Sequence, residues 1–582
     1  MMRFKRNLLK LAGWLVGLGF VAVSGAGQEG NPRPLPSFGV VFNDDADLAF
    51  VVPDRQRAEA LLRANVAALA DTPVKTLVYC VGMGGDLLYY NTNVASPVGW
   101  RQSPDEVPGS LLALRLENAR VNLAAGADAV RTAGEAAKAL GLRFIPSLRM
   151  NDAHFMVDPD RHAMTSAFWF KHRDRYIIKD SPLEWQKAYG NLLDYTHEQV
   201  RQLRLDTVGE VIERNAELVD GFELDFNRFQ VFFPQGRAGA GAPLMTELVR
   251  SVRAKLDQLA RATGRSMSLL VRIPPSLADA TTAGLEVERW MREGLVDLVS
   301  PAQIMTLAGD MPIADLVELG RRHRVAIYPS LYPRTSWRVP FPPLGVDRYV
   351  GLKVGRDANL EEIRGAAANY VRLGVAGFYL FNFYNAFGST RPHDPRLYQV
   401  FRDIARPENL VGQGKVYAVT KSYYNDGPGS YAYGKQLPIA IDGGAGVQIA
   451  VNVAEQPGAA PFPGRSCELR LGLRGVAAEA QLTVLWNGRE LVARAFAELE
   501  KVETRKLAGG NSRAADLAES YLHFPLAFSD LALNGPNTLH VAVSTASGAT
   551  RLTDVEVRLD YHNDLDSHWR RVATPLNQLP GR

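Results

Sequence analysis

Short apolar runs alternate with amphipathic helical runs from Phe38 to about Pro407, and this alternation restricts the fold more than any other feature of the chain. Eight runs are rich in β-branched and aromatic residues and apolar nearly throughout, as strands covered on both faces are. They span 38–42, 75–82, 142–150, 221–226, 268–273, 296–301, 325–331 and 377–383. Helical patterns with a period near 3.6 lie between them, over 119–141, 244–264, 313–323 and 359–374. Because parallel strands need crossovers of this kind, the pattern predicts an α/β fold, a (β/α)8 TIM barrel.

An open, doubly wound sheet is the alternative for the same alternation. Such a sheet usually carries a glycine-rich phosphate-binding turn after its first strand. Here that turn reads Asn43-Asp44-Asp45-Ala46 and contains no glycine. The barrel is therefore favoured.

The texture changes after Asn409, where the helical periodicity ends and alternating strands begin. Turn signals such as Asn487-Gly488 separate them. This pattern is typical of an antiparallel β-sandwich. We expect the barrel over 27–409 and a jelly-roll-like sandwich over 410–582, with its strands at 446–453, 466–473, 480–488, 537–543 and 555–561.

The first 26 residues have the pattern of an export signal. Met1–Lys10 is basic, Leu11–Val23 is apolar, and Ser24-Gly25-Ala26 offers small residues before a cut. The apolar stretch is short for a membrane span, so we expect a cleaved signal peptide over 1–26 and a secreted or periplasmic protein. An uncleaved anchor is the alternative. No later segment is long and apolar enough to cross a membrane.

Charge and cysteine content exclude several other classes. Without the basic start, 62 basic residues balance 62 acidic ones, whereas binding to phosphates needs clustered Lys and Arg. We therefore expect no nucleic-acid partner. The two cysteines, Cys80 and Cys467, fall in different predicted domains and are expected to be buried rather than paired. No Cys/His spacing indicates a metal site, so we expect no metal and no cofactor. The oligomeric state stays open.

Function in a barrel lies at the carboxyl ends of the strands. The strand ends here are rich in carboxylates, amides, arginines and tyrosines, which suit a polyhydroxyl ligand. Asp45 and Asn227 belong to this inventory without an assigned role. We expect Asp225, Glu223 and Asp152 to be catalytic, and the substrate to be bound by Arg149, Asn151, His154, Arg228, Arg272, Asn43, Asp44, Tyr328, Asn382 and Tyr384.

The run 220–226, Asp-Gly-Phe-Glu-Leu-Asp-Phe, is the strongest signal. Side chains two apart on a strand face the same way, so Glu223 and Asp225 are expected to point inward together. Two such carboxyls can hold each other's pKa values apart, which separates an acid from a base. A structural ion pair of Glu223 with Arg149 or Arg272 is the alternative. A loop-capping role is the alternative for Asp152 and His154.

These residues resemble those of a known family. The run 220–229, followed by Phe232-Phe233-Pro234, resembles the strand-4 signature of the glycosyl-hydrolase-like family 10 barrels, which are secreted bacterial proteins. Asp225 and Arg228 match its Asp-aromatic-x-Arg pattern, and 147–154 is similar to its strand-3 segment. The resemblance implies a glycoside-hydrolase-like barrel over about 38–407. Family 18 chitinases place their acid where this chain has Asn227, so chitinase-type hydrolysis is not expected.

The sequence therefore predicts a secreted hydrolase of O-glycosidic bonds in a poly- or oligosaccharide. In this interpretation Asp225 is the nucleophile or base, and Glu223 or Asp152 is the acid. A carbohydrate-binding protein with a degenerate barrel is one alternative, because strands 5 to 8 supply no obvious carboxylate. A polysaccharide lyase is another, with Tyr384 or His154 as base and Arg228 neutralising a uronate. The C-terminal part resembles the jelly-roll modules of carbohydrate-active enzymes, with Trp486 or Tyr521 as sugar-stacking candidates. Buried packing is the alternative for both rings.

Overall fold

A computed structural model describes most of the chain. The described residues are 36–84, 86–102, 106–152, 159–176, 192–303, 306–335, 356–383, 395–421, 436–441, 445–455, 466–476, 480–491, 500–501, 520–533, 535–544 and 550–561. Residues 36–582 belong to one compact unit. No helix in these ranges combines the length and apolar character that a membrane crossing requires.

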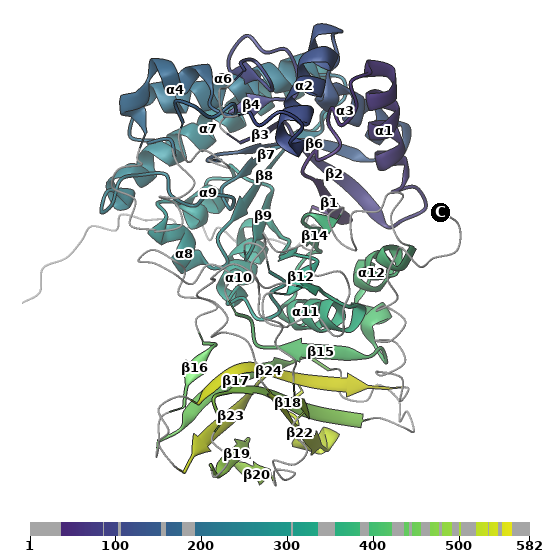
Figure 1. Ribbon diagram of the computed structural model, residues 1–582, viewed down its shortest axis with the longest axis vertical. Helices are drawn as coiled ribbons and strands as arrows, with labels where there is room; N and C mark the ends of the chain where they lie inside the picture. Colours follow the sequence, from purple (N-terminus) through teal and green to yellow (C-terminus); the bar gives the residue numbers. More distant parts are fainter. Residues whose placement is uncertain are drawn as a thin grey trace, which may run out of the picture. The chain divides into compact units, whose positions relative to one another are not determined.

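A parallel sheet of nine strands dominates the first part of this unit (Figure 1). Its order is β10-β9-β8-β7-β6-β2-β1-β14-β11. The two end strands, β10 and β11, follow one another in the chain and are separated only by Tyr328 and Pro329, so the sheet curls until its edges lie next to each other. The strands are β1 Val40–Asp44, β2 Val74–Cys80, β6 Arg143–Arg149, β7 Gly221–Asp225, β8 Ser268–Ile273, β9 Leu298–Pro301, β10 Ala326–Ile327, β11 Ser330–Leu331 and β14 Tyr379–Leu380.

The inner side of the curled sheet has its own apolar cluster, separate from the larger core between sheet and helices. Because side chains alternate along a strand, the strands that contribute to this cluster do so through the residues of their inner face. Its members come from both ends of the strand order, which agrees with the curl. They are Phe38, Val41, Val78, Ile145, Leu270, Leu298, Ala326, Tyr328, Tyr332, Tyr379 and Phe381.

Helices follow the strands and pack on the outer side of the sheet (Figure 1). Local capping accounts for several of their ends: Asn359 forms a capping box with Glu362, and Gly374 ends the same helix in the left-handed region. The helices are α1 Arg55–Ala67, α2 Leu111–Ala124, α3 Ala129–Ala139, α4 Ala167–Lys171, α6 Glu198–Arg214, α7 Ala238–Thr263, α8 Leu277–Thr282, α9 Val287–Arg292, α10 Ala314–His323, α11 Leu360–Leu373 and α12 Pro395–Ala405.

The single helix predicted over 119–141 is wrong, because the chain forms two helices there, α2 and α3. Gly126 takes a positive φ of 78°, which an α-helix does not allow. Asp128 then accepts a hydrogen bond from the Arg131 amide and begins α3 as its N-cap. The Gly-Ala-Asp sequence at the break carried this signal, but the apolar periodicity on both sides hid it.

All strands of the last part pair antiparallel, in two sheets. One has the order β15-β24-β18-β22-β21, with β16 paired to β24, and the other has the order β17-β23-β19-β20. Their bounds are β15 Lys415–Ala418, β16 Ile439–Ala440, β17 Val447–Val453, β18 Ser466–Arg474, β19 Leu482–Trp486, β20 Arg489–Leu491, β21 Glu500–Lys501, β22 Ser520–Leu526, β23 Gly535–Val543 and β24 Arg551–Asp560. The predicted change from alternating strands and helices to antiparallel strands agrees with this pairing.

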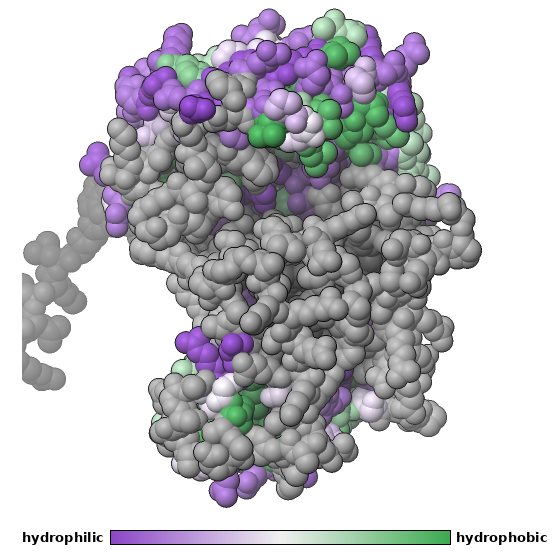
Figure 2. Space-filling model, viewed as in Figure 1, coloured by the Kyte–Doolittle hydropathy of each residue, from purple (hydrophilic) through white to green (hydrophobic). Residues whose placement is uncertain are grey.

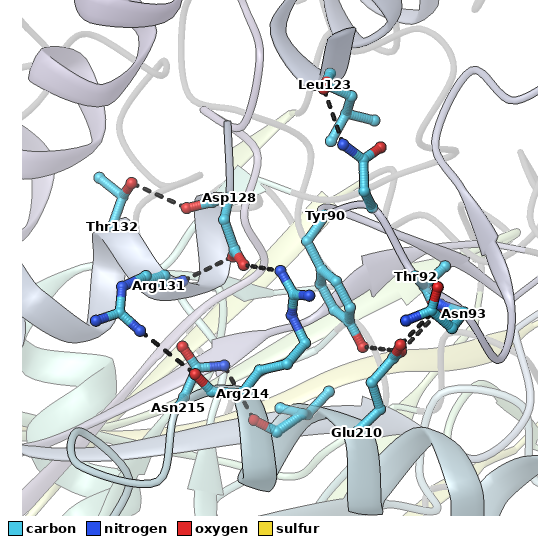
Figure 3. Close-up of polar contacts among 12 residues, drawn as sticks. Tyr90, Thr92, Asn93, Leu123, Asp128, Arg131, Thr132, Glu210, Arg214 and Asn215 are labelled. Carbon is cyan, nitrogen blue, oxygen red and sulfur yellow. Dashed lines mark hydrogen bonds and ion pairs between the residues drawn. The ribbon is translucent and has the colours of Figure 1, made fainter. Parts of the chain in front are cut away.

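The loop after β2 is tied to helix α6 by one carboxylate, that of Glu210 (Figure 3). This loop contains the short strands β3 Gly82–Met83, β4 Leu87–Leu88 and β5 Ser96–Pro97. Glu210 accepts hydrogen bonds from the Tyr90 hydroxyl at 3.0 Å, the Thr92 hydroxyl at 2.5 Å and the Asn93 amide at 2.7 Å. Arg214, one turn later, stacks its guanidinium on the Tyr90 ring. Glu210 therefore anchors this loop.

Replacing Glu210 by alanine is expected to lower the free energy of unfolding by about 2 kcal/mol, because three donors lose a charged acceptor. The matched control is Glu213→Ala, at an exposed position of the same helix, with an expected change below about 0.5 kcal/mol. Urea denaturation of both variants measures the difference. Equal stabilities of the two variants would show that the loop does not depend on Glu210.

Candidate functional site

The pleat of β6, β7 and β8 turns polar side chains toward the inside of the curled sheet. The strand register places Ser147 opposite Glu223, and it places Arg149 and Arg272 on either side of Asp225. All of these side chains except that of Arg149 are buried, and Arg149 is half-buried. Charged groups inside a protein need partners, so the pairing among these side chains decides which carboxyl at the carboxyl ends of the strands is ion-paired and which is not.

Glu223 is a buried carboxyl that forms no ion pair with any residue that the structure describes. Its Oε1 accepts hydrogen bonds from the Ser147 hydroxyl at 2.7 Å and from the Tyr379 hydroxyl at 3.0 Å. Its Oε2 has no hydrogen-bond partner among the described residues. Burial, together with the negative charge of Asp225, raises the pKa of Glu223 to about 7. The alternative ion pair of Glu223 with Arg149 or Arg272 is therefore wrong, and Glu223 can carry a proton near neutral pH.

Asp225 takes the ion pair instead. Its Oδ2 lies 2.8 Å from a guanidinium nitrogen of Arg272, and its Oδ1 accepts from the Asn227 amide at 2.8 Å. The Arg272 guanidinium also stacks on the Phe381 ring, 3.8 Å from its centroid. Asp225 is therefore held in an ion pair, whereas Glu223, two residues earlier on the same strand, is held by hydroxyl groups.

Arg149 bridges two further carboxylates. Its guanidinium lies 2.7 Å from Asp45 and 2.8 Å from Asp152. Burial would raise the pKa of Asp45, but the positive charges of Arg149, Arg228 and Arg272 outweigh it and hold that pKa below its usual value. Asp152 thus stands in an ion pair rather than as an isolated acid. Asp45 faces the site although the sequence assigned it no role, and the alternation Val41, Asn43, Asp45 was the signal for it.

Asp44 does not face the site. Its two oxygens accept hydrogen bonds from the Ala46 amide and the Asn65 side chain of α1, both at 2.8 Å. The pleat of β1 turns Asp44 toward the helices because its neighbours Asn43 and Asp45 take the inner face. The expectation that Asp44 binds substrate is corrected accordingly, and its carboxylate joins strand to helix.

Tyr328 and Asn151 are also occupied elsewhere. The Tyr328 hydroxyl accepts from the Phe38 amide at 3.0 Å, before β1 begins and therefore at the opposite end of the sheet from the carboxylates. Asn151 accepts from the Leu193 amide and donates to the Leu193 and Val231 carbonyls, so it ties two loops together. The predicted contact of either residue with substrate is not supported by these positions.

Arg228 and Asn382 remain at this edge, with Arg228 half-buried and Asn382 buried at the end of β14. Asn382 has a φ of 58°, in the left-handed region that asparagine tolerates. The predicted ligands His154 and Tyr384 lie outside the described residues. Within the described ranges, no group of three or more His, Cys, Asp or Glu residues could hold a metal ion.

Several buried polar atoms at the same strand ends have no hydrogen-bond partner among the described residues. Buried polar groups are nearly always paired in proteins, so a cluster of unpaired ones needs a reason, and a bound polar ligand is one. The structure adds Asn227 and Ser300 to the residues chosen from the sequence. The unpaired atoms are Asn43 Oδ1, Glu223 Oε2, Asn227 Nδ2, Arg272 Nε, Ser300 Oγ and Asn382 Oδ1.

The two sugar-stacking candidates of the antiparallel sheets are buried. Trp486 is 1% exposed and donates its indole N–H to the Asp530 carbonyl at 2.9 Å. Tyr521 is 6% exposed and lies against the Arg470 guanidinium, 3.7 Å from the ring centroid. Both rings therefore pack inside the protein, as the alternative of buried packing predicts.

No family model matches the chain, and no curated protein matches it. The resemblance to glycosyl-hydrolase-like family 10 therefore stays a prediction.

Solved structures that match parts of the chain include glycoside hydrolases and related enzymes. The catalytic domain of β-amylase from Paenibacillus polymyxa has a TM-score of 0.36 at 11% identity, over 64% of this chain and 98% of that one. A family GH18 chitinase from Chromobacterium violaceum has a TM-score of 0.35 at 10% identity, over 90% and 88%. A cycloisomaltooligosaccharide glucanotransferase from Paenibacillus sp. has a TM-score of 0.33 at 9% identity, and this chain spans only 57% of its length. Similarities this low establish neither a shared fold nor a shared activity.

Proposed function

We propose that the protein is a secreted or periplasmic glycoside hydrolase. In this proposal the curled parallel sheet and its helices are a (β/α)8 barrel over 27–409, the antiparallel sheets are a β-sandwich over 410–582, and residues 1–26 are a cleaved signal peptide. The observation that carries the proposal is the pair on β7, in which Glu223 has a pKa of about 7 and Asp225 is ion-paired. Glycosidic bond cleavage needs one carboxyl that gives a proton and one that is ionised.

The proposed roles follow from the hydrogen bonds of each carboxyl. Two hydroxyls donate to Glu223 Oε1, so its proton resides on Oε2, and from there it is given to the leaving glycosidic oxygen. Asp225 acts on the sugar as nucleophile or as base toward water. Asp152 holds Arg149 and transfers no proton in this scheme.

The charge balance of the site supports a neutral substrate. With Glu223 protonated, three carboxylates (Asp45, Asp152 and Asp225) face three guanidinium groups (Arg149, Arg228 and Arg272), and Arg149 and Arg272 are directly ion-paired. A uronate would need a cation beyond this balance, because the three guanidinium groups are already matched by the three carboxylates. The unpaired acceptors of Asn43, Ser300 and Asn382 suit donating hydroxyl groups. The proposed substrate is therefore an uncharged poly- or oligosaccharide.

The test is product release from a panel of neutral polysaccharides and aryl glycosides, with Asp225→Asn beside the wild type. We expect at least a hundredfold loss of kcat/KM, because the substitution removes the charge and keeps the shape. Asp220→Asn is the matched control, the same change at the other end of the same strand, where the carboxylate accepts from the Phe144 amide. Equal cleavage by Asp225→Asn and wild type would overturn the site. Binding without cleavage would favour a carbohydrate-binding protein, and products that absorb ultraviolet light through a new double bond would indicate a lyase.

A further inference from the structure

Helix α2 has two apolar faces, and only one of them is covered. Leu116, Ala119 and Leu123 face the core and are at most 5% exposed. The opposite side exposes Leu111 by 82%, Leu114 by 53% and Val121 by 41%. The charged residues Arg115, Glu117 and Arg120 lie between the two faces, and an exposed apolar surface bordered by polar residues usually marks an interaction site. The outer face of α2 is thus expected to meet something outside the described part of this chain.

The exposed apolar surface is concentrated at this helix. Among the described residues, the large apolar side chains that are exposed are Trp100, Val107, Leu111, Leu114 and Val121. Figure 2 shows hydrophobic residues gathered over the region of α1 to α3 beside strongly hydrophilic surface. We call these five residues the α2 stripe. Ser110 caps the helix by accepting from the Ala113 amide, and the packing of Leu116, Ala119 and Leu123 into the core turns the other apolar face outward.

The spacing of the stripe within the helix is that of a helix-pairing seam. Positions 111, 114, 118 and 121 of α2 and its C-cap 125 follow one another at intervals of three and four, as the seam positions of paired helices do. They carry Leu, Leu, Asn, Val and Ala, with no charged residue among them. Val107 precedes the helix and extends the apolar surface beyond its N-terminus.

We propose that the α2 stripe is the interface of a symmetric dimer, in which α2 packs antiparallel on α2 of a second copy. A two-fold axis brings the same surface together from both copies, so the surface must complement itself. An antiparallel pair centred near Leu116 sets Leu111 against Val121 of the second copy and Leu114 against Asn118 of the second copy. Larger side chains then meet smaller ones, and the two helix dipoles oppose each other.

The size of the stripe fits this occupant. From their exposed fractions, the five side chains present about 500 Å² of surface, near the upper limit for an apolar patch on a monomer. A standard interface takes about 800 Å² from each partner, so the stripe would form its apolar core and the surrounding polar residues its rim. Four of the five residues are aliphatic, whereas a surface that binds glycans would present several aromatic rings.

The test is the mass of the full chain, expressed for export, by sedimentation velocity from about 1 to 100 μM, the range in which interfaces of this size associate. We expect a dimer in the wild type and a monomer in the double variant Leu111→Glu/Leu114→Glu. The matched control is Ala254→Glu/Ala262→Glu, which adds the same charges at exposed positions of α7 and should stay dimeric. A monomeric wild type, or a double variant that remains dimeric, would overturn the proposal.

Disulfide trapping tests the antiparallel register without adding charge. Leu114→Cys mixed with Asn118→Cys should form a mixed disulfide dimer in preference to either homodimer. The native Cys80 and Cys467 are buried, and burial raises the pKa of each thiol to about 12, so neither competes. Preferential trapping of either homodimer contradicts the register. A monomer that binds lipid vesicles, with binding lost in Leu111→Glu/Leu114→Glu, assigns the stripe to a membrane surface and overturns the dimer.

Discussion

Glu223→Gln is expected to lower kcat/KM for a cleaved glycoside by a factor of about 10²–10⁴, the usual contribution of a general acid. Glutamine keeps the shape of the side chain and can still accept from the Ser147 and Tyr379 hydroxyls at its carbonyl oxygen. Its amide nitrogen would take the place of Oε2, and the N–H protons of an amide are far too weakly acidic to be transferred to the leaving oxygen. Steady-state kinetics on an aryl glycoside measure the loss. Unchanged activity would remove Glu223 from the mechanism.

The pH profile gives the sign of this role. The neutral form of Glu223 is the active one, and its pKa is about 7, so kcat/KM of the wild type should fall as pH rises through 7. Tyr379→Phe removes a hydrogen bond that favours the charged form of Glu223. The pKa of Glu223 and the alkaline limb of the profile should therefore both move to higher pH. A limb that stays in place in this variant would show that another group controls it.

Glu223→Gln is also expected to change how stability depends on pH. Folding raises the pKa of Glu223 from 4.5 to about 7, so between these values the folded state holds a proton that the unfolded state releases. The stability of the wild type therefore falls as pH rises through this window, by about 3 kcal/mol from this one group. Glu223→Gln lacks that dependence. Its melting temperature relative to the wild type should rise between pH 5 and pH 8, and a constant difference would contradict a buried, neutral Glu223.

Arg272→Met is expected to cause the largest loss of stability, about 3–5 kcal/mol, because it leaves the carboxylate of Asp225 buried without its cation. Methionine keeps the unbranched apolar stem of the side chain but not the guanidinium, so the loss combines the missing ion pair with the missing contact to the Phe381 ring. Denaturation in urea at pH 7 measures it. The comparison that isolates the ion pair is a double-mutant cycle with Asp225→Asn.

In that cycle the double variant Arg272→Met/Asp225→Asn should be more stable than Arg272→Met alone, because the unpaired charge is gone. Additive losses from the two substitutions would show that Asp225 and Arg272 do not stabilise each other. The cycle also separates stability from chemistry. Arg272→Met/Asp225→Asn should recover folding and should remain inactive, since Asp225 is the ionised carboxyl of the proposed reaction.

Much of the fold could be predicted because it depends on local pattern. Each of the eight predicted strand runs overlaps a strand of the curled sheet, and the run 268–273 coincides with β8, whereas β1 continues to Asp44, beyond the predicted 38–42. The run 325–331 corresponds to two short strands, β10 and β11, that pair with opposite neighbours. Apolar, β-branched runs of this length are buried wherever they pair, so their positions follow from composition. The break between α2 and α3 was missed because the apolar periodicity on both sides of it does not reveal a short change of backbone direction.

The candidate site could be predicted only in part. The inward direction of Glu223 and Asp225 follows from the two-residue period of a strand, and the structure agrees with it. Which of the two carries the ion pair does not follow from sequence. Arg272 lies on the next strand, level with Asp225 in the register, so it reaches Asp225. Glu223 lies two residues earlier on its strand, where the hydroxyls of Ser147 and Tyr379 donate to it.

The sequence by itself determined where the strands run, where antiparallel pairing replaces the parallel sheet, and that carboxyls gather at one set of strand ends. These properties belong to residues near one another in the chain. Only the tertiary structure decided that Asp45 rather than Asp44 faces inward, that the Tyr328 hydroxyl reaches the far end of the sheet, and that Asp225 takes the ion pair while burial raises the pKa of Glu223. The reason is physical: a pKa and a hydrogen-bond partner depend on burial and on groups from distant strands, and these distances exist only once the sheet has curled.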